Sequence, residues 1–313
     1  MTVSAVKIIQ PGEIQGLPDD ETPLLVLPLA KEVLKERFAR LEQLSKDGSL
    51  KDWLGFCAKV AKAQLDSIDE IAPESLEENV VRESLKHGMP PASIGTWKAG
   101  ADWDHAFELL TKALLAQELP EPARKILEVF KGSNGAELRQ MAEQFLQADE
   151  RNIKPEWAPF IGAILQMIWM QKVAQLAPYA SYYKGQSTLC PVCGSHPIAS
   201  VVRVGTRDAH RYLVCSLCSS EWYASRARCT NCETPKEVNM LGETKESLVQ
   251  GECCDDCHGY LKIMYQSRDP MMEVMADDLA SIQVDLALSN EGYQRTGRNM
   301  FFMVGGETVE KDS

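Results

Sequence analysis

The first half of the sequence has the hydrophobic periodicity of α-helices. Between residues 29 and 47, Ala30, Leu34 and Phe38 recur four positions apart, as happens when one face of a helix is buried. The same periodicity predicts further helices that begin near Ser49, Ser75, Asp102, Pro122, Asn134 and Trp157. The pattern therefore predicts an all-α helical domain over residues 29–185.

The starts of these helices carry local signals of their own. Ser49 with Asp52, and Ser75 with Glu78, match the capping box, in which the two side chains bond each other's backbone. Before the first helix, prolines and glycines punctuate the chain from residue 11 onward. We therefore expect residues 1–28 to be an extended lead-in without a packed element.

The most apolar stretch, Trp157 to Ala177, is not predicted to cross a membrane. A transmembrane helix needs about 18 or more consecutive apolar residues, and Gln166, Gln171 and Lys172 interrupt this run. We expect it to be the central core helix of the helical domain, and we predict no membrane span.

Beyond residue 185 the period changes to the alternation that is typical of β-strands. The expected strands are Ile198–Val204, Arg211–Val214, Glu237–Leu241, Leu248–Val249 and Tyr260–Tyr265. Helical spacing returns from Pro270, and residues 269–313 are expected to form a C-terminal helix, with Asp277, Asp278 and Asp285 on its outside, and a polar tail. The predicted fold class is α+β: an N-terminal all-α helical domain, two tandem rubredoxin-like or zinc-ribbon β modules (186–226 and 227–268), and a C-terminal helix.

Eight of the ten cysteines lie in the β modules as Cys-x-x-Cys pairs, namely Cys190/Cys193, Cys215/Cys218, Cys229/Cys232 and Cys254/Cys257. Adding 39 to positions 190, 193, 215 and 218 gives 229, 232, 254 and 257, so the segment is an internal repeat. Two such pairs complete a tetrahedral four-thiolate site. The spacing predicts one metal site per module, with all eight cysteines as ligands.

Several alternatives stay open at this point. A crossed arrangement, with the first pair facing the third and the second facing the fourth, is compatible with the spacing, which also does not separate iron from zinc. Disulfides are less compatible, because residues 1–10 contain one Lys and no apolar stretch of a secretion signal. We therefore expect a cytoplasmic protein with metal-bound cysteines.

Other reactive side chains are expected to have minor roles. Four thiolates close a metal site to water and substrate, which argues against an enzyme and specifically against a metallohydrolase. His196, His210 and His258 lie near the cysteine pairs and are expected at the surface or beside the ligands. Cys253 is expected to be a spare thiol, and Cys57 a core residue on a helix face.

Charge separates the remaining functional classes. The net charge is −12, and residues 186–262 hold eight Lys or Arg against nine Asp or Glu, so no basic stripe is available for a phosphate backbone. A zinc-ribbon nucleic-acid binder is therefore the weakest alternative, behind a rubredoxin-like electron carrier. The first module is locally basic, and we interpret its arginines as a candidate face for a protein partner: Arg203, Arg207, Arg211, Arg226 and Arg228.

The order of the motifs resembles one family. CPVCGSHP, RYLVCSLCSSEW, RCTNC and CCDDCHGYLKIMY, followed by ADDLASIQVDLAL and GYQRTGRN, are similar to FdhE, the formate dehydrogenase accessory protein. The resemblance implies two iron ions in rubredoxin-type sites, with zinc as the alternative. It further implies a cytoplasmic, non-enzymatic maturation factor that acts on the catalytic subunit of respiratory formate dehydrogenase before export.

Overall fold

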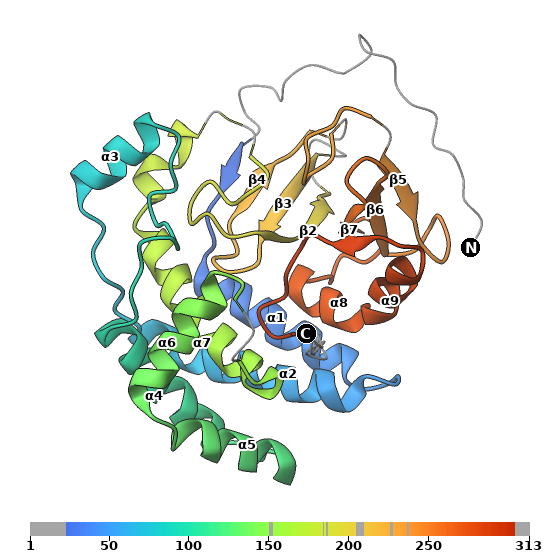
Figure 1. The fold of residues 1–313 in the computed structure, drawn as a ribbon. Helices are drawn as coiled ribbons and strands as arrows, with labels where there is room; N and C mark the ends of the chain where they lie inside the picture. The colour runs from blue at the N-terminus through green and yellow to red at the C-terminus, as the bar shows by residue number, and fades with distance from the viewer. Residues whose placement is uncertain are drawn as a thin grey trace, which may run out of the picture.

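The structure is a computed structural model that describes residues 23–149, 153–183, 185, 187–204, 210–225, 228–236 and 238–303. Seven helices come before the β modules, and all of them except α3, which lies apart from the others, pack together on one side of a β-sheet (Figure 1). They are α1 (Ala30–Leu44), α2 (Lys51–Ser67), α3 (Glu78–Lys86), α4 (Ala101–Leu115), α5 (Glu121–Lys131), α6 (Gly135–Leu146) and α7 (Ala158–Ala174). The predicted fold class is confirmed.

The expected helix caps are confirmed only in part. The Asn134 side chain accepts a hydrogen bond from Ala136 N and so caps α6. Neither predicted capping box forms, because α2 follows Leu50 and α3 follows Glu77, and neither helix start has a side-chain cap. The predicted caps Ser49 and Ser75 therefore lie one and two residues before the observed N-cap positions.

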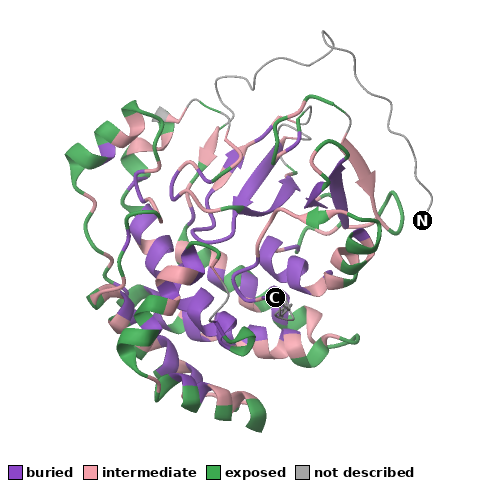
Figure 2. Cartoon of the chain, viewed as in Figure 1, coloured by how far each residue is buried: buried purple, intermediate pink, exposed green. Residues whose placement is uncertain are grey.

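Helix α7 lies at the centre of the core, as its apolar composition predicts. Residues 158–170 are all buried, and buried residues gather where the helices face the sheet (Figure 2). The glutamine that interrupts the apolar run is buried with partners: Gln166 accepts a hydrogen bond from Arg37 and donates one to Ser216 O at 2.8 Å. Within the described part of the chain, no helix has the length and apolarity to cross a membrane.

The strands of both β modules belong to one sheet, with the order β1-β4-β3-β2-β7-β6-β5 and with β8 beside β7. They are β1 (Leu25–Val26), β2 (Pro197–Val202), β3 (Arg211–Cys215), β4 (Glu221–Tyr223), β5 (Val238–Leu241), β6 (Val249–Cys254), β7 (Gly259–Tyr265) and β8 (Gln294–Arg295). The modules are joined by parallel pairing of β2 with β7, in which Ser200 lies opposite Ile263. Strand β1 pairs with β4, so the expectation of no packed element before residue 29 was wrong.

The predicted C-terminal helix is two helices, α8 (Val274–Ala280) and α9 (Ile282–Asn290), interrupted at Ser281. Helix α8 lies between α1 and the sheet (Figure 1). The prediction that Asp277 and Asp278 lie on its outside was wrong, since they are 3% and 1% exposed. Their burial is possible because basic side chains from both neighbouring layers reach them, as described in the Discussion.

Candidate metal centres

The eight paired cysteines form two clusters, and within each cluster the four Sγ atoms lie within 4.8 Å of one another. The first cluster contains Cys190, Cys193, Cys215 and Cys218, and the second contains Cys229, Cys232, Cys254 and Cys257. Each cluster is built from two Cys-x-x-Cys turns, here called knuckles, of the same β module. The sulfurs therefore have the tandem arrangement, and the crossed arrangement is not observed.

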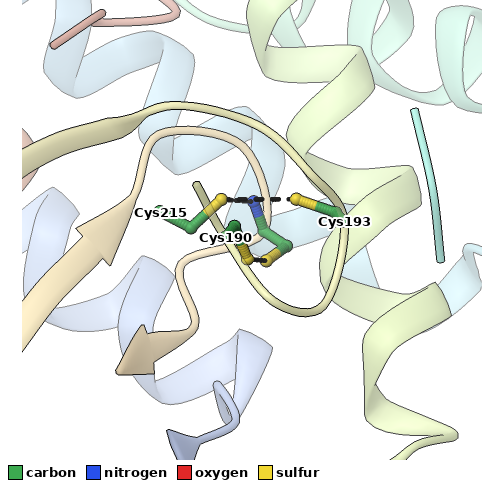
Figure 3. Close-up of side chains that lie close together, drawn as sticks. Cys190, Cys193 and Cys215 are labelled. Carbon is green, nitrogen blue, oxygen red and sulfur yellow. Dashed lines mark hydrogen bonds between the residues drawn. The ribbon is translucent and has the colours of Figure 1, made fainter. Parts of the chain in front are cut away.

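The sulfur spacing fits a metal ion better than it fits disulfides. The Sγ atoms of Cys190 and Cys218 are 3.7 Å apart, and those of Cys193 and Cys215 are 3.4 Å apart, facing one another across the cluster (Figure 3). A disulfide joins sulfurs at about 2.05 Å. Four sulfurs at about 2.3 Å from one ion are separated by about 3.8 Å along each tetrahedral edge. In the second cluster the distance is 3.9 Å from Cys229 to Cys257. Both clusters thus bring four sulfurs close enough together to bind one metal ion.

A shared backbone conformation shapes all four knuckles. The residue after the second cysteine of each pair has a positive φ: Gly194 at +82°, Ser219 at +59°, Glu233 at +59° and His258 at +52°. This left-handed conformation turns the chain back, so that Cys190 N donates to the carbonyl of Ser195 at 2.9 Å. Only the first of the four positions is glycine, the residue that adopts this conformation at no steric cost. The sequence therefore signals the turn clearly only at Gly194.

The first cluster concentrates thiols in a buried environment. Burial raises the pKa of Cys190 and of Cys193 well above the ordinary thiol value. Burial also disfavours ionisation of Cys218, but hydrogen bonds with the neighbouring thiols and with Ser220 lower its pKa well below that value. A bound cation would supply the positive charge that lets all four sulfurs ionise.

The comparison with known proteins follows the same division of the chain. Residues 22–184 match the family model "FdhE, N-terminal", residues 189–226 match "FdhE, central domain", and residues 227–302 match "FdhE, C-terminal domain". The chain belongs to the FdhE family. The predicted resemblance is thereby confirmed, and it extends to the helical part, which has no sharp motif of its own.

Individual FdhE proteins match over almost the whole chain. Protein FdhE of Escherichia coli is 34% identical over 311 residues, covering 97% of this chain and 99% of that protein. Protein FdhE of Salmonella arizonae is 34% identical over 307 residues, with the same shares covered. The crystal structure of the FdhE protein from Pseudomonas aeruginosa has a TM-score of 0.80 and 29% identity, and covers 91% of this chain and 100% of that chain. The similarity therefore includes the arrangement of helices and sheet.

The sequence analysis missed one side chain of this FdhE fold that contacts the second cluster. Asn231 Nδ2 lies 3.5 Å from Cys257 Sγ and donates to it. Burial disfavours the Cys257 thiolate, but this bond and the Gly259 N–H lower the pKa of Cys257 to about 7. The sequence did contain a signal for Asn231, because this residue lies between the two cysteines of the knuckle Cys229-Thr-Asn-Cys232.

The remaining candidate residues lie outside both clusters. Within the described residues, the groups suited to metal contain cysteines alone, while His196 and His258 are exposed and His210 is partly exposed. Cys57 is fully buried in the helical core, as expected. Cys253 is also fully buried, and packs with Tyr260 and Leu288 on the other side of β6 from its neighbour Cys254.

The prediction of a basic face on the first module is wrong for Arg211, which is buried, whereas Arg203 is partly exposed. Arg211 is 2% exposed and forms an ion pair with Glu252 of β6. Arg203 forms an ion pair with Glu221 of β4, so its charge is compensated within the sheet. Arg228 is exposed, and Arg207 and Arg226 lie outside the described residues. The sequence could not reveal the pair of Arg211 with Glu252, because the two residues come from different modules.

Proposed function

We propose that this chain is a non-enzymatic accessory protein for the maturation of formate dehydrogenase. In this proposal it binds the catalytic subunit of the respiratory enzyme in the cytoplasm, before that subunit is exported. The observation that carries the proposal is the match to the FdhE family along both the helical part and the cysteine modules. The large helical part supports it, because an electron carrier needs little protein beyond the metal site.

We further propose that each cluster binds one metal ion, with Cys190, Cys193, Cys215 and Cys218 holding the first and Cys229, Cys232, Cys254 and Cys257 the second. Iron in rubredoxin-type sites is the first choice and zinc the alternative. The donor set supports both, since four thiolates suit either ion. When bound, the ion stabilises the module, and iron additionally supplies a one-electron redox couple.

Two structural features support a role without catalysis. Four sulfurs leave no open position on the ion for water or substrate. A cavity of about 80 Å³ lies between α1, β3 and α8, far below the few hundred Å³ that a typical ligand pocket has. Arg37, which lines this cavity, already bonds Glu273, Gln166 and Ser219. The purified protein is therefore expected not to oxidise formate with any electron acceptor.

The decisive experiment is capture of the client. Tagged protein is expected to retain the formate dehydrogenase catalytic subunit from a cell extract, and Cys229→Ser/Cys232→Ser is expected to weaken this capture, because the second site loses two ligands and the energy that orders its module. Far-UV circular dichroism shows whether the helices of the variant remain folded. Lys125→Ala, an exposed change on α5, is the matched control and is expected to capture normally.

A second candidate function is electron transfer, and one observation favours it. Cys232 is exposed and Cys257 partly exposed, so an ion in the second site would lie close to solvent and to a redox partner. Capture that is undiminished in a variant shown to lack the second metal would favour this alternative. It would also place client binding on the helical part.

A further inference from the structure

The two clusters differ in how far their sulfurs are buried. All four cysteines of the first cluster are at most 2% exposed. In the second cluster, Cys229 and Cys254 are buried, whereas Cys232 is exposed and Cys257 partly exposed. The two sites have the same cysteine spacing, so we attribute this difference to what the rest of the chain packs against each of them.

The helical part covers the first knuckle of the first cluster. In the loop between α3 and α4, Ala92 N donates to Val192 O and Ile94 N donates to Cys193 O, both at 2.9 Å. Pro90 from the same loop lies over Gly194, with its Cγ 3.4 Å from the position of an added Cβ. The chain segment that holds Cys190 and Cys193 is thus bonded to the helical part by its backbone.

The other knuckle of the first cluster is held in the same way. Gln166 of α7 donates to the carbonyl of Ser216 at 2.8 Å, and Arg37 of α1 donates to Ser219 Oγ at 3.3 Å. Both donors are themselves buried. Cys215 lines the cavity of about 80 Å³ described above, which has room for water but not for a chelator such as EDTA. A chelator can therefore reach these four sulfurs only if the helices and the sheet separate.

Exposed side chains surround the second cluster. Thr234 Oγ1 and Lys236 Nζ bond the Asp256 carboxylate at 2.6 and 3.1 Å, and Tyr293 OH bonds Asp255 at 2.6 Å. These partners belong to the second module and to the segment after α9. Exposed contacts of this kind open locally at small cost, whereas a buried interface opens only with much of the fold.

From this contrast we propose that the two sites have different tasks. The first holds its ion tightly, releases it slowly and connects the helical part to the sheet, and the second exchanges its ion with the solution through Cys232 and Cys257. The inference rests on the proposed occupation of both clusters by metal. Release from the second site needs only a local rotation of the side chains of the exposed ligands. Their thiolates take up protons from water as the ion passes to the chelator.

The test uses the full chain loaded with zinc and challenged with excess EDTA in the presence of N-ethylmaleimide. We expect one ion to leave at least about tenfold faster than the other, which corresponds to about 1.4 kcal/mol in activation free energy. Mass spectrometry should find Cys232 and Cys257 alkylated as the first ion leaves, and the first cluster alkylated only with the second ion. Cys57 and Cys253, buried thiols outside the clusters, report on global unfolding.

Two variants test whether the loop between α3 and α4 slows the release of the ion from the first cluster. Pro90→Ala removes the contact over Gly194 without changing a ligand, and is expected to speed the slow release and leave the fast release unchanged. Met89→Ala changes the exposed neighbouring residue and is expected to alter neither rate. Release of both ions at one rate, or alkylation of the first cluster before the second, would overturn the inference alone. A chain that binds no zinc or iron would overturn the proposed metal sites as well.

Discussion

Asp277 and Asp278 are neighbours in α8 but bind basic side chains on opposite sides of the helix. Asp277 Oδ1 accepts a hydrogen bond from Arg40 Nη2 of α1 at 2.7 Å, and Asp278 Oδ1 lies 3.2 Å from Lys262 Nζ of β7. Arg295 Nη2 also reaches Asp278, at 2.7 Å. Two adjacent carboxylates therefore connect the helical part to the sheet through α8.

The first prediction concerns the stability of this connection. Asp278→Asn leaves the buried Lys262 without one of its two carboxylates, so we expect a loss of about 3–5 kcal/mol in the free energy of unfolding. Asp66→Asn, which breaks the exposed pair with Lys62 on α2, is the control and is expected to cost about 0.5 kcal/mol or less. Urea unfolding followed by circular dichroism measures both. Equal losses in the two variants would contradict a special role for α8.

The second prediction is a pH dependence with a definite sign. Burial by itself raises the pKa of Asp278, but Arg295 and Lys262 outweigh it and hold the pKa below its ordinary value. A lowered pKa contributes stability that is present above about pH 4 and lost as the pH falls through the folded-state pKa. The difference in unfolding free energy between wild type and Asp278→Asn should therefore narrow on acidification.

Urea unfolding of both proteins between pH 7 and 3 measures this narrowing. Asp277 contributes with the opposite sign, because burial raises its pKa. Its contribution and any acid release of metal are common to both proteins and cancel in the difference. A difference that stays constant over this range would show that the ionisation of Asp278 does not contribute.

The third prediction tests a close approach of the chain to α7. A Cβ on Gly162 would lie 1.9 Å from Met300 O, so Gly162→Ala must displace backbone and is expected to destabilise by about 1–3 kcal/mol. Gly55 in α2 has room for a Cβ, with Ser45 Cβ at 3.7 Å. Gly55→Ala is therefore expected to stabilise by about 0.5–1 kcal/mol. If the two changes alter the melting temperature in the same direction, residues 299–303 do not lie against α7.

The fourth prediction uses the strained knuckle positions. Glu233 has a φ of +59°, a conformation that costs a residue with a side chain about 1–2 kcal/mol. Glu233→Gly should stabilise the zinc-loaded second module by about 0.5–1 kcal/mol after the entropy of glycine is subtracted. The reverse change, Gly194→Ala at a φ of +82°, should destabilise. Thermal melts of the loaded proteins measure both, and a loss of stability in Glu233→Gly would contradict the explanation.

The fifth prediction concerns metal content. Because the sulfurs group within modules, Cys190→Ser/Cys193→Ser should lose one ion and keep the other. Elemental analysis by mass spectrometry gives the ratio of metal to protein. Loss of both ions from a variant whose second module remains folded would contradict separate sites.

The sequence by itself determined the features that depend on local pattern. The helices follow from hydrophobic spacing, and the eight paired thiols follow from four Cys-x-x-Cys motifs. The repeat favoured the tandem grouping of the thiols, but only the structure distinguished it from the crossed one. The same information predicted α7 as a core helix and Cys57 as a core residue. In each case the residues that carry the signal lie within one element or one short turn.

The tertiary structure alone decided which charges are buried and which candidate metal site is exposed. Arg40 and Asp277 are separated by 237 positions, so nothing near Asp277 in the sequence shows that its carboxylate has a buried partner. The parallel pairing of β2 with β7 likewise joins distant strands and brings Arg211 to Glu252. Two sites with the same cysteine spacing became different because the α3–α4 loop and α7 pack on only one of them, and burial depends on such distant partners.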